Sequence, residues 1–176
     1  MNTGIQDAFD VGWKLGWILR GWAGAELLET YEVERRPIAL HNVGRAAEPG
    51  GARRATDEAL PWDLDDRLTH AWLDRHGGQV STIDLIADGL TLYAEAAGVG
   101  WELAAQVTGW SAPLQVEVVD PATAAVIGLV PGGAVLVRPD GHEVARWLSP
   151  DTAPIPGVAW SSRVTGGPGA SPAAPR

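Results

Sequence analysis

Apolar residues in the first 24 positions recur every three or four residues, a spacing that predicts an amphipathic helix. Thr3–Gln6 fits the Thr-x-x-Gln capping box and predicts where this helix begins, while Gly21 and Gly24 predict where it ends. Lys14 and Arg20 fall on faces other than the main apolar row. The apolar positions form one main row and a second row beside it: Val11, Leu15, Ile18, Leu19 and Trp22, then Trp13 and Trp17. Two rows indicate a helix that is covered on more than one side.

Two glycines lie inside this predicted helix, at Gly12 and Gly16. Each would weaken an isolated helix by roughly 1 kcal/mol relative to Ala. Their presence therefore indicates that another backbone packs closely against the helix.

A second helix is predicted from Ala25 to Arg36, where apolar positions alternate with charged ones that we expect mainly outside: Glu29, Glu32, Glu34, Arg35 and Arg36. Pro37 predicts a break or kink, because proline restricts the residue before it. Helical spacing resumes through Val43 and ends in the Glu48–Gly51 segment, which is rich in proline and glycine. This segment, followed by Arg53 and Arg54, predicts a linker.

The carboxyl-terminal half has short apolar runs separated by turn residues, which predict strands at 81–86, 90–93, 114–119, 134–137 and 142–147, with a helix at 101–107. Arg138–Gly141 joins the last two strands through Pro-Asp-Gly, in which proline fixes one φ and glycine tolerates a positive one. The fold class expected is therefore α+β. After Trp160 the chain is rich in glycine, proline, serine and alanine, which predicts a disordered tail.

Composition excludes several classes of function. The chain has no cysteine, so disulfides, thiolate metal sites and a redox CxxC motif are excluded. The formal charge is −9, from 22 acidic and 13 basic residues, and an acidic chain without a basic stripe is a poor nucleic-acid ligand. No apolar run approaches a membrane span and no signal peptide is present, so a cytoplasmic protein without membrane contact is expected.

The sequence contains few signals of catalytic residues or cofactor-binding motifs. There is no G-x-G-x-x-G, P-loop or G-x-S-x-G motif. The four histidines, which we expect to be solvated, are too scattered for metal-ligand spacing: His41, His70, His76 and His142. Arg35 and Arg36 are interpreted as charges at a helix end, Arg53 and Arg54 as solvated, and most of the nine tryptophans as core or interface residues. We therefore predict no catalytic residue and no metal ligand.

The first 37 residues resemble a segment of the FAD-dependent aromatic-ring hydroxylases, flavoprotein monooxygenases of the para-hydroxybenzoate and phenol hydroxylase type. The resemblance is carried by four stretches: Met1–Ala8 (MNTGIQDA), Trp13–Leu15 (WKL), Leu19–Gly24 (LRGWAG) and Leu27–Pro37 (LLETYEVERRP). Downstream, four weaker stretches are similar to the terminal domain of the polyketide-tailoring branch: Arg67–Leu73, Ser81–Leu85, Gly89–Leu92 and Val137–Gly141. The first segment is highly specific, and the later ones follow in the family's order.

The resemblance implies a domain organisation. Residues 1–48 would be a helical remnant of the FAD-binding domain and residues 49–61 a linker. Residues 62–160 would be a small thioredoxin-like domain without cysteines, and residues 161–176 the disordered tail. The family's upstream flavin-binding motifs are absent and the stretch between Arg36 and Arg67 is short for the family. We therefore expect a carboxyl-terminal portion that begins inside a longer ancestral frame and has lost an internal segment.

The same resemblance implies a cofactor site at the start of the first helix. The backbone at Met1, Asn2 and Thr3 would approach the flavin ring and its ribityl chain. A helix amino terminus suits the negative charge of reduced flavin, because it presents unpaired N–H groups and a positive dipole end. The cofactors implied are FAD and, as reductant, NAD(P)H.

The function implied is hydroxylation of an aromatic polyketide-like substrate, with the isolated chain expected to be inactive. A non-catalytic interaction module is the alternative, which would form a homodimer or dock on a separately encoded FAD domain through its tryptophan-rich helix. A small enzyme that has abandoned flavin is a third possibility, but no acid–base constellation supports it.

Overall fold

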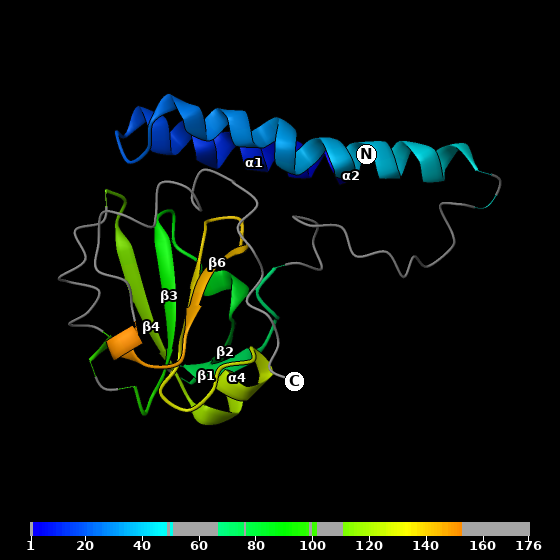
Figure 1. The fold of residues 1–176 in the computed structure, drawn as a ribbon. Coiled ribbons are helices and arrows are strands. Elements are labelled where there is room, and N and C mark those ends of the chain that lie inside the picture. Colours follow the sequence, from blue (N-terminus) through cyan, green and yellow to red (C-terminus); the bar gives the residue numbers. More distant parts are fainter. Residues whose placement is uncertain are drawn as a thin grey trace.

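A computed structural model describes residues 2–48, 50, 67–75, 77–98, 100–101 and 111–152, and the backbone alone at Asn2. Two long helices open the chain: α1 covers Asn2–Leu19 and α2 covers Glu29–Ala47, with a 3-10 turn at Ala25–Leu28 between them. They pack side by side in opposite directions and lie across one end of the sheet (Figure 1). Several expectations fall outside the described residues: Met1, the Arg53–Arg54 pair, His76, most of the 101–107 helix and the tail.

The remainder forms a sheet domain. The β1 (Trp72–Arg75) and β2 (Gly78–Ser81) strands make an antiparallel hairpin. The larger sheet has the order β4-β3-β5-β6, and is built from Leu90–Glu95 (β3), Leu114–Val119 (β4), Ala134–Val137 (β5) and Glu143–Trp147 (β6). The β3 and β4 strands are parallel, whereas β5 pairs antiparallel with both β3 and β6. A short α4 helix (Pro121–Val126) and 3-10 turns at Ile83–Leu85 and Pro150–Thr152 complete the described elements.

Alternating side chains of the central strands build a core on each face of the sheet, because successive residues of a strand point to opposite sides. Leu90, Leu92 and Leu136 face the cluster that also contains Trp13 and Trp17 of α1. The other face packs a second cluster under α4 and the hairpin, which includes Leu73, Tyr93, Val119, Ala124, Ile127, Val135 and Val137. The first cluster joins the helix pair to the sheet, so the helices and the sheet share one core.

Of the two predicted apolar rows of α1, the Trp13 and Trp17 row is buried, whereas the main row is partly exposed. Trp13, Lys14 and Trp17 are buried with Asp10, whereas Leu15 and Leu19 are exposed. Lys14 lies apart from the Leu15 and Leu19 row, as expected, and its ammonium group is paired inside the structure. The prediction of a closely packed backbone at Gly12 is wrong, because no described atom lies within 4 Å of where its Cβ would stand.

The first two predicted helix boundaries also need correction. Thr3 does not cap α1 but lies inside it, and its Oγ1 accepts a hydrogen bond from Asn42 Nδ2 (3.1 Å). Pro37 lies inside α2 and does not end it. Proline removes one backbone donor and so frees the carbonyl of Val33, four residues earlier. The Val33 side chain is exposed, so water can reach this face of the helix.

Most of the predicted strands are confirmed, with 114–119 and 134–137 matching β4 and β5 residue for residue. The 81–86 strand is wrong, because β2 ends at Ser81 and a 3-10 turn follows. The β1 strand of the hairpin and the short helix α4 were not predicted. The α+β class is confirmed, while the thioredoxin-like assignment and the domain bounds stay predictions. Neither long helix among the described residues has the apolar length needed to span a bilayer.

Candidate functional site

The amino-terminal end of α1 is the first candidate site. A helix begins with backbone N–H groups that have no partner within the helix. The first turn of α1 contains no acidic side chain, and no described atom lies within 4 Å of the position of a Cβ at Gly4. This end of α1 therefore offers unpaired donors, open space on one side and no competing negative charge.

Of the three predicted cofactor residues, Asn2 and Thr3 lie in the first turn of α1, and Met1 lies outside the described residues. The Thr3 side chain ties this turn to α2 through its bond to Asn42. These features fit one side of a bound flavin by the chemistry of the donors. FAD binding by the three residues stays a prediction.

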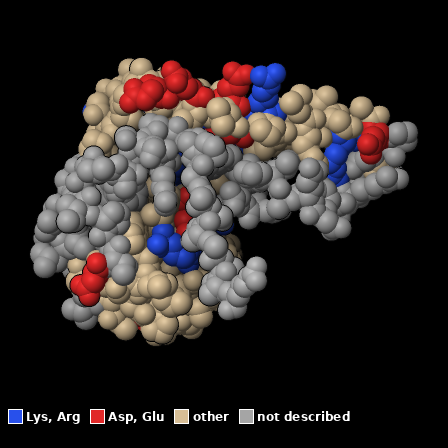
Figure 2. Space-filling view, in the orientation of Figure 1, with Lys and Arg blue, Asp and Glu red and all other residues tan. Residues whose placement is uncertain are grey.

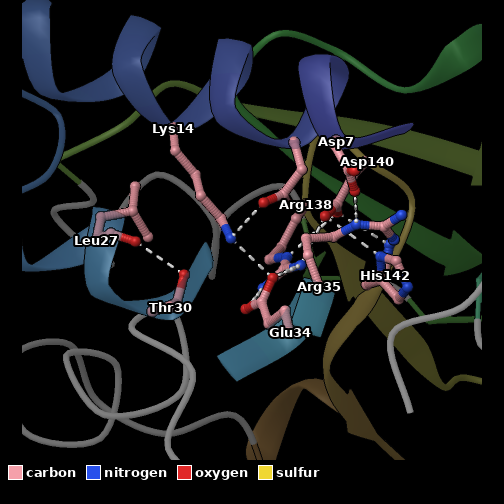
Figure 3. Close-up of polar contacts among 10 residues, drawn as sticks. Asp7, Lys14, Leu27, Thr30, Glu34, Arg35, Arg138, Asp140 and His142 are labelled. Carbon is pink, nitrogen blue, oxygen red and sulfur yellow. Dashed lines mark hydrogen bonds and ion pairs between the residues drawn. The ribbon is translucent and has the colours of Figure 1, made fainter. Parts of the chain in front are cut away.

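A buried charge cluster joins the helices to the sheet domain, and consists of Asp10, Lys14, Glu34, Arg138 and Asp140 (Figure 3). The Lys14 Nζ lies 2.8 Å from Asp10 Oδ2 and 2.9 Å from Glu34 Oε2. The Arg138 guanidinium binds both oxygens of Glu34, at 2.8 and 3.1 Å, and its Nη2 lies 2.6 Å from Asp140 Oδ2. One continuous set of ion pairs therefore links α1, α2 and the loop after β5.

The loop that delivers Arg138 and Asp140 is the predicted Pro-Asp-Gly turn. Gly141 has φ +84°, and its N–H donates to the Arg138 carbonyl at 2.9 Å. The Arg138 N–H in turn donates to the His142 carbonyl at 3.0 Å, which closes the turn. The tight turn brings the Asp140 carboxylate back onto the Arg138 guanidinium, so local turn chemistry preforms half of the cluster.

Burial and pairing shift the pKa values of the acidic members in different directions. Burial raises the pKa of Asp10, and its pairing with Lys14 offsets only part of this effect. Burial also acts on Glu34 and Asp140, but the neighbouring Arg138 outweighs it and holds the pKa of both carboxyls below the usual range. The two carboxylates that contact Arg138 are therefore the firmly ionised ones.

A second pairing holds the two helices together beside the cluster. Arg35 Nε donates to Asp7 Oδ1 at 2.8 Å, and Arg35 Nη2 donates to Gln6 Oε1 at 3.1 Å. Gln6 therefore contacts the neighbouring helix and is not used in the predicted capping box. The predicted outside positions of Glu34 and Arg35 are wrong, because both side chains are buried. The predicted helix-end role of Arg35 and Arg36 is also wrong, because α2 continues to Ala47.

The carboxylates of Asp10, Glu34 and Asp140 place ligand atoms within 4.8 Å of one another, a spacing that a metal ion could bridge. Lys14 and Arg138 already lie between these carboxylates and pair with all three of them. The two cations occupy the places from which a metal ion would contact the carboxylates, so we assign the cluster to packing between the helices and the sheet.

His142 is the histidine that departs from the predicted solvated state. It is 3% exposed, and its Nδ1 lies 3.3 Å from Asp140 Oδ2. His70 is exposed as expected, and His41 is partly exposed. The sequence signal for His142 was its place at the start of the predicted 142–147 strand, where every second residue can enter a core.

The comparisons with known proteins agree with this architecture. The family model described as "Aromatic-ring hydroxylase, C-terminal" matches residues 64–167, which is more than half of the chain. The model described as "FAD binding domain" matches residues 1–46. The chain belongs to the FAD-dependent aromatic-ring hydroxylases. The resemblance seen in the sequence is thus confirmed for both halves of the chain.

A putative polyketide hydroxylase from Streptomyces halstedii is 34% identical over 212 residues, covering 87% of this chain and 38% of the relative. A tetracenomycin B2 monooxygenase-dioxygenase from Streptomyces olivaceus is also 34% identical, covering 88% and 37%. The chain thus spans less than two fifths of the length of these relatives. The first alignment is longer than the chain's 176 residues, so that relative contains segments that this chain lacks.

Among solved structures, an aklavinone-11 hydroxylase in complex with FAD and aklavinone superposes with a TM-score of 0.71 and 28% identity. The match covers 93% of this chain and 40% of the other. The substrate-free form of the rebeccamycin biosynthetic enzyme RebC gives a TM-score of 0.68 and 30% identity, covering 94% and 39%. The helix pair and the sheet domain thus occur together in flavoenzyme relatives.

Proposed function

We propose that this chain supplies the carboxyl-terminal domain of an FAD-dependent monooxygenase, and that the start of α1 forms one wall of its flavin site. The observation that carries the proposal is the match of residues 1–46 to an FAD-binding domain, together with the open donors at the start of α1. The backbone N–H groups at Met1, Asn2 and Thr3 would donate toward the negative charge of the reduced flavin.

The chain's own residues have a positioning role in this proposal. When bound, the flavin supplies the oxygen-transfer chemistry, and the protein orients it and excludes water. The Thr3–Asn42 and Arg35–Asp7 contacts hold the start of α1 against α2. The buried charge cluster then holds both helices on the sheet domain, so the flavin-facing end rests on a rigid base.

The proposed substrate class is taken from the relatives, and the proposed reductant from the family resemblance. Proteins similar to this chain are named as polyketide, tetracenomycin and aklavinone hydroxylases or monooxygenases, which supports an aromatic polyketide-like substrate. NAD(P)H is the reductant that the family resemblance implies, and a cytoplasmic location accords with such biosynthetic chemistry. Each of these assignments describes the complete enzyme.

The isolated chain does not hold FAD in this proposal. Its sequence contains no G-x-G-x-x-G motif, and it spans 38% of the first relative's length. Purified chain should therefore be colourless at 450 nm, and titration into FAD should leave the flavin fluorescence unchanged. A yellow purified protein, or saturable quenching of FAD fluorescence with one site per chain, would contradict the proposal of an incomplete site.

An interaction module without catalysis is the second candidate, and the exposed apolar side chains of the helix pair favour it. These are Ile5, Phe9, Leu15 and Leu19 on α1 and Val33, Leu40 and Val43 on α2. Exposed apolar side chains of this kind suit contact with a protein partner. Acidic side chains gather on the outer side of the helical layer (Figure 2). Glu26, Glu29 and Glu32 are exposed.

The partner of this surface would be a second copy of the chain or a separately encoded FAD domain. Light scattering of the purified chain tests whether the partner is a second copy of the chain. A stable dimer at micromolar concentration supports a homodimeric interaction module. A monomer argues against that module and supports contact of this surface with the flavin domain.

A further inference from the structure

A groove of about 550 Å³ lies between the β1 strand and the α4 helix, at the end of the sheet domain away from the helix pair (Figure 1). Its walls are residues 71–74 on one side and Asp120, Ala122, Thr123 and Val126 on the other. Successive residues of β1 line it although their side chains alternate between two faces, so the groove follows the edge of the strand.

This edge of β1 is unpaired. In the part of the chain that the structure describes, the hairpin sheet contains β1 and β2 only. The Thr82 N–H donates to the Ala71 carbonyl at 2.9 Å, and the direction of pairing alternates along an antiparallel ladder. The backbone N–H and C=O of Leu73 therefore point to β2, whereas those of Trp72 and Asp74 point to the groove. Such a row of unpaired groups is a template for another strand.

The groove carries negative charge. Asp74 is exposed, and no ion pair engages it among the described residues, since the adjacent Arg75 pairs with Glu117 at 2.7 Å. Asp120 is also exposed, and the Thr123 hydroxyl, which donates to its Oδ2 at 2.6 Å, holds the pKa of this carboxyl below the usual range. No lysine or arginine lines the groove, so its charges favour a cationic ligand.

Trp72 adds an aromatic surface that suits a cation. This residue is 59% exposed, and its ring packs edge to face with His70, with centroids 4.9 Å apart. The face of an indole attracts lysine and arginine side chains. On the opposite wall Val126 is exposed and offers an apolar contact. The groove thus combines an unpaired strand edge, two carboxylates and an accessible indole.

We propose that this groove binds an extended basic segment of a partner protein, which adds to β1 as a further strand. The backbone of the segment pairs with Trp72 and Asp74, and its cationic side chains contact the two carboxylates and the indole. In strand addition, backbone bonds supply affinity and alternate side chains supply specificity. A second copy of the chain is disfavoured by its formal charge of −9. The site uses no residue of the flavin-facing end, so its test is independent of the proposed monooxygenase function.

A seven-residue peptide of alternating threonine and lysine, with blocked ends, is a suitable probe of the full chain. Calorimetry should show one peptide per chain, and the matching threonine–glutamate peptide should not bind. A peptide of the same charge with two inner threonines replaced by proline should bind about tenfold more weakly, because proline removes backbone donors. In ¹⁵N-labelled chain, the peptide should protect the Trp72 and Asp74 amides from hydrogen exchange, whereas the Leu73 amide is protected already.

Asp74→Asn should weaken binding about two- to fivefold, the range of one exposed ion pair. Asp88→Asn is the matched control, since Asp88 is exposed and lies outside the groove, and it should leave binding unchanged. Equal affinity for the lysine and proline peptides, unprotected amides at saturating peptide, equal losses in both variants, or no binding would overturn the proposal. Protection of the same amides in concentrated chain without peptide would assign the edge to a second copy and also overturn it.

Discussion

Lys14 is the one lysine of the chain, and its ammonium group is fully buried between Asp10 and Glu34. Removing one partner of a buried ion pair leaves an uncompensated charge, which costs about 3–5 kcal/mol. We therefore expect Lys14→Met to lower the free energy of unfolding by that amount, measured by urea denaturation. The exposed Arg36–Glu32 pair provides the control, and Arg36→Gln should cost less than about 1 kcal/mol. Equal effects of the two variants would show that the cluster does not hold the helices.

The depressed pKa values of Asp140 and Glu34 predict how stability depends on pH. Below pH 3.8 to 4.5, their ordinary values, the unfolded chain takes up protons that the folded cluster does not. Stability is therefore full above this window and decreases as the pH falls through it and below. Denaturation at pH 7, 4 and 3 should show a smaller acid-induced loss in Asp140→Asn than in the unaltered chain. Parallel losses in both proteins would refute the assignment.

For the residues of the charge cluster, the sequence predicted the Pro-Asp-Gly turn but not the buried ion pairs. Pro139–Gly141 carries its own conformational signal, since proline and glycine fix the turn locally. Lys14, Glu34 and Arg138 carry no such signal, because charged side chains on helices are ordinarily exposed. Their burial depends on a contact between residues 104 positions apart, which no local pattern encodes.

The glycines of the elements differ in what surrounds them. Gly12 lies in the middle of α1 with open space around it, so Gly12→Ala should raise the free energy of unfolding of the isolated chain by about 0.5–1 kcal/mol. At Gly89, just before β3, a Cβ would collide with the Pro113 carbonyl in the backbone of the neighbouring segment. Gly89→Ala should therefore lower the thermal midpoint while Gly12→Ala raises it. Shifts of the same sign in both variants would contradict these surroundings.

The sequence predicted strands more accurately than helix faces for a physical reason. The β4 and β5 strands are bounded by turn residues and alternate between two cores, so period and punctuation agree. In α1, the Leu15 and Leu19 row is apolar yet exposed, whereas the buried row includes Asp10 and Lys14. Hydrophobicity alone indicated the buried Trp13 and Trp17 but not the buried Asp10 and Lys14, because the buried face of this helix is partly ionic.

At the scale of the whole molecule, the helix pair and the sheet domain form one unit through a shared core and a shared charge cluster. The end of α1 that would face the flavin is expected from the resemblance, since it follows a family motif. A cleft between α1 and three loops of the sheet domain, at residues 67–70, 83–88 and 139–141, could not be predicted, because its walls come from separate parts of the chain.

The central claim is that this chain completes a flavin site when the rest of a flavoenzyme is present. The most direct measurement is the flavin content of a chimera in which this chain replaces the matching portion of the Streptomyces halstedii relative. We predict a chimera that purifies with close to one FAD per chain by absorbance at 450 nm, while the isolated chain binds none. A chimera that unfolds cooperatively, and so is folded, yet holds no flavin would contradict it.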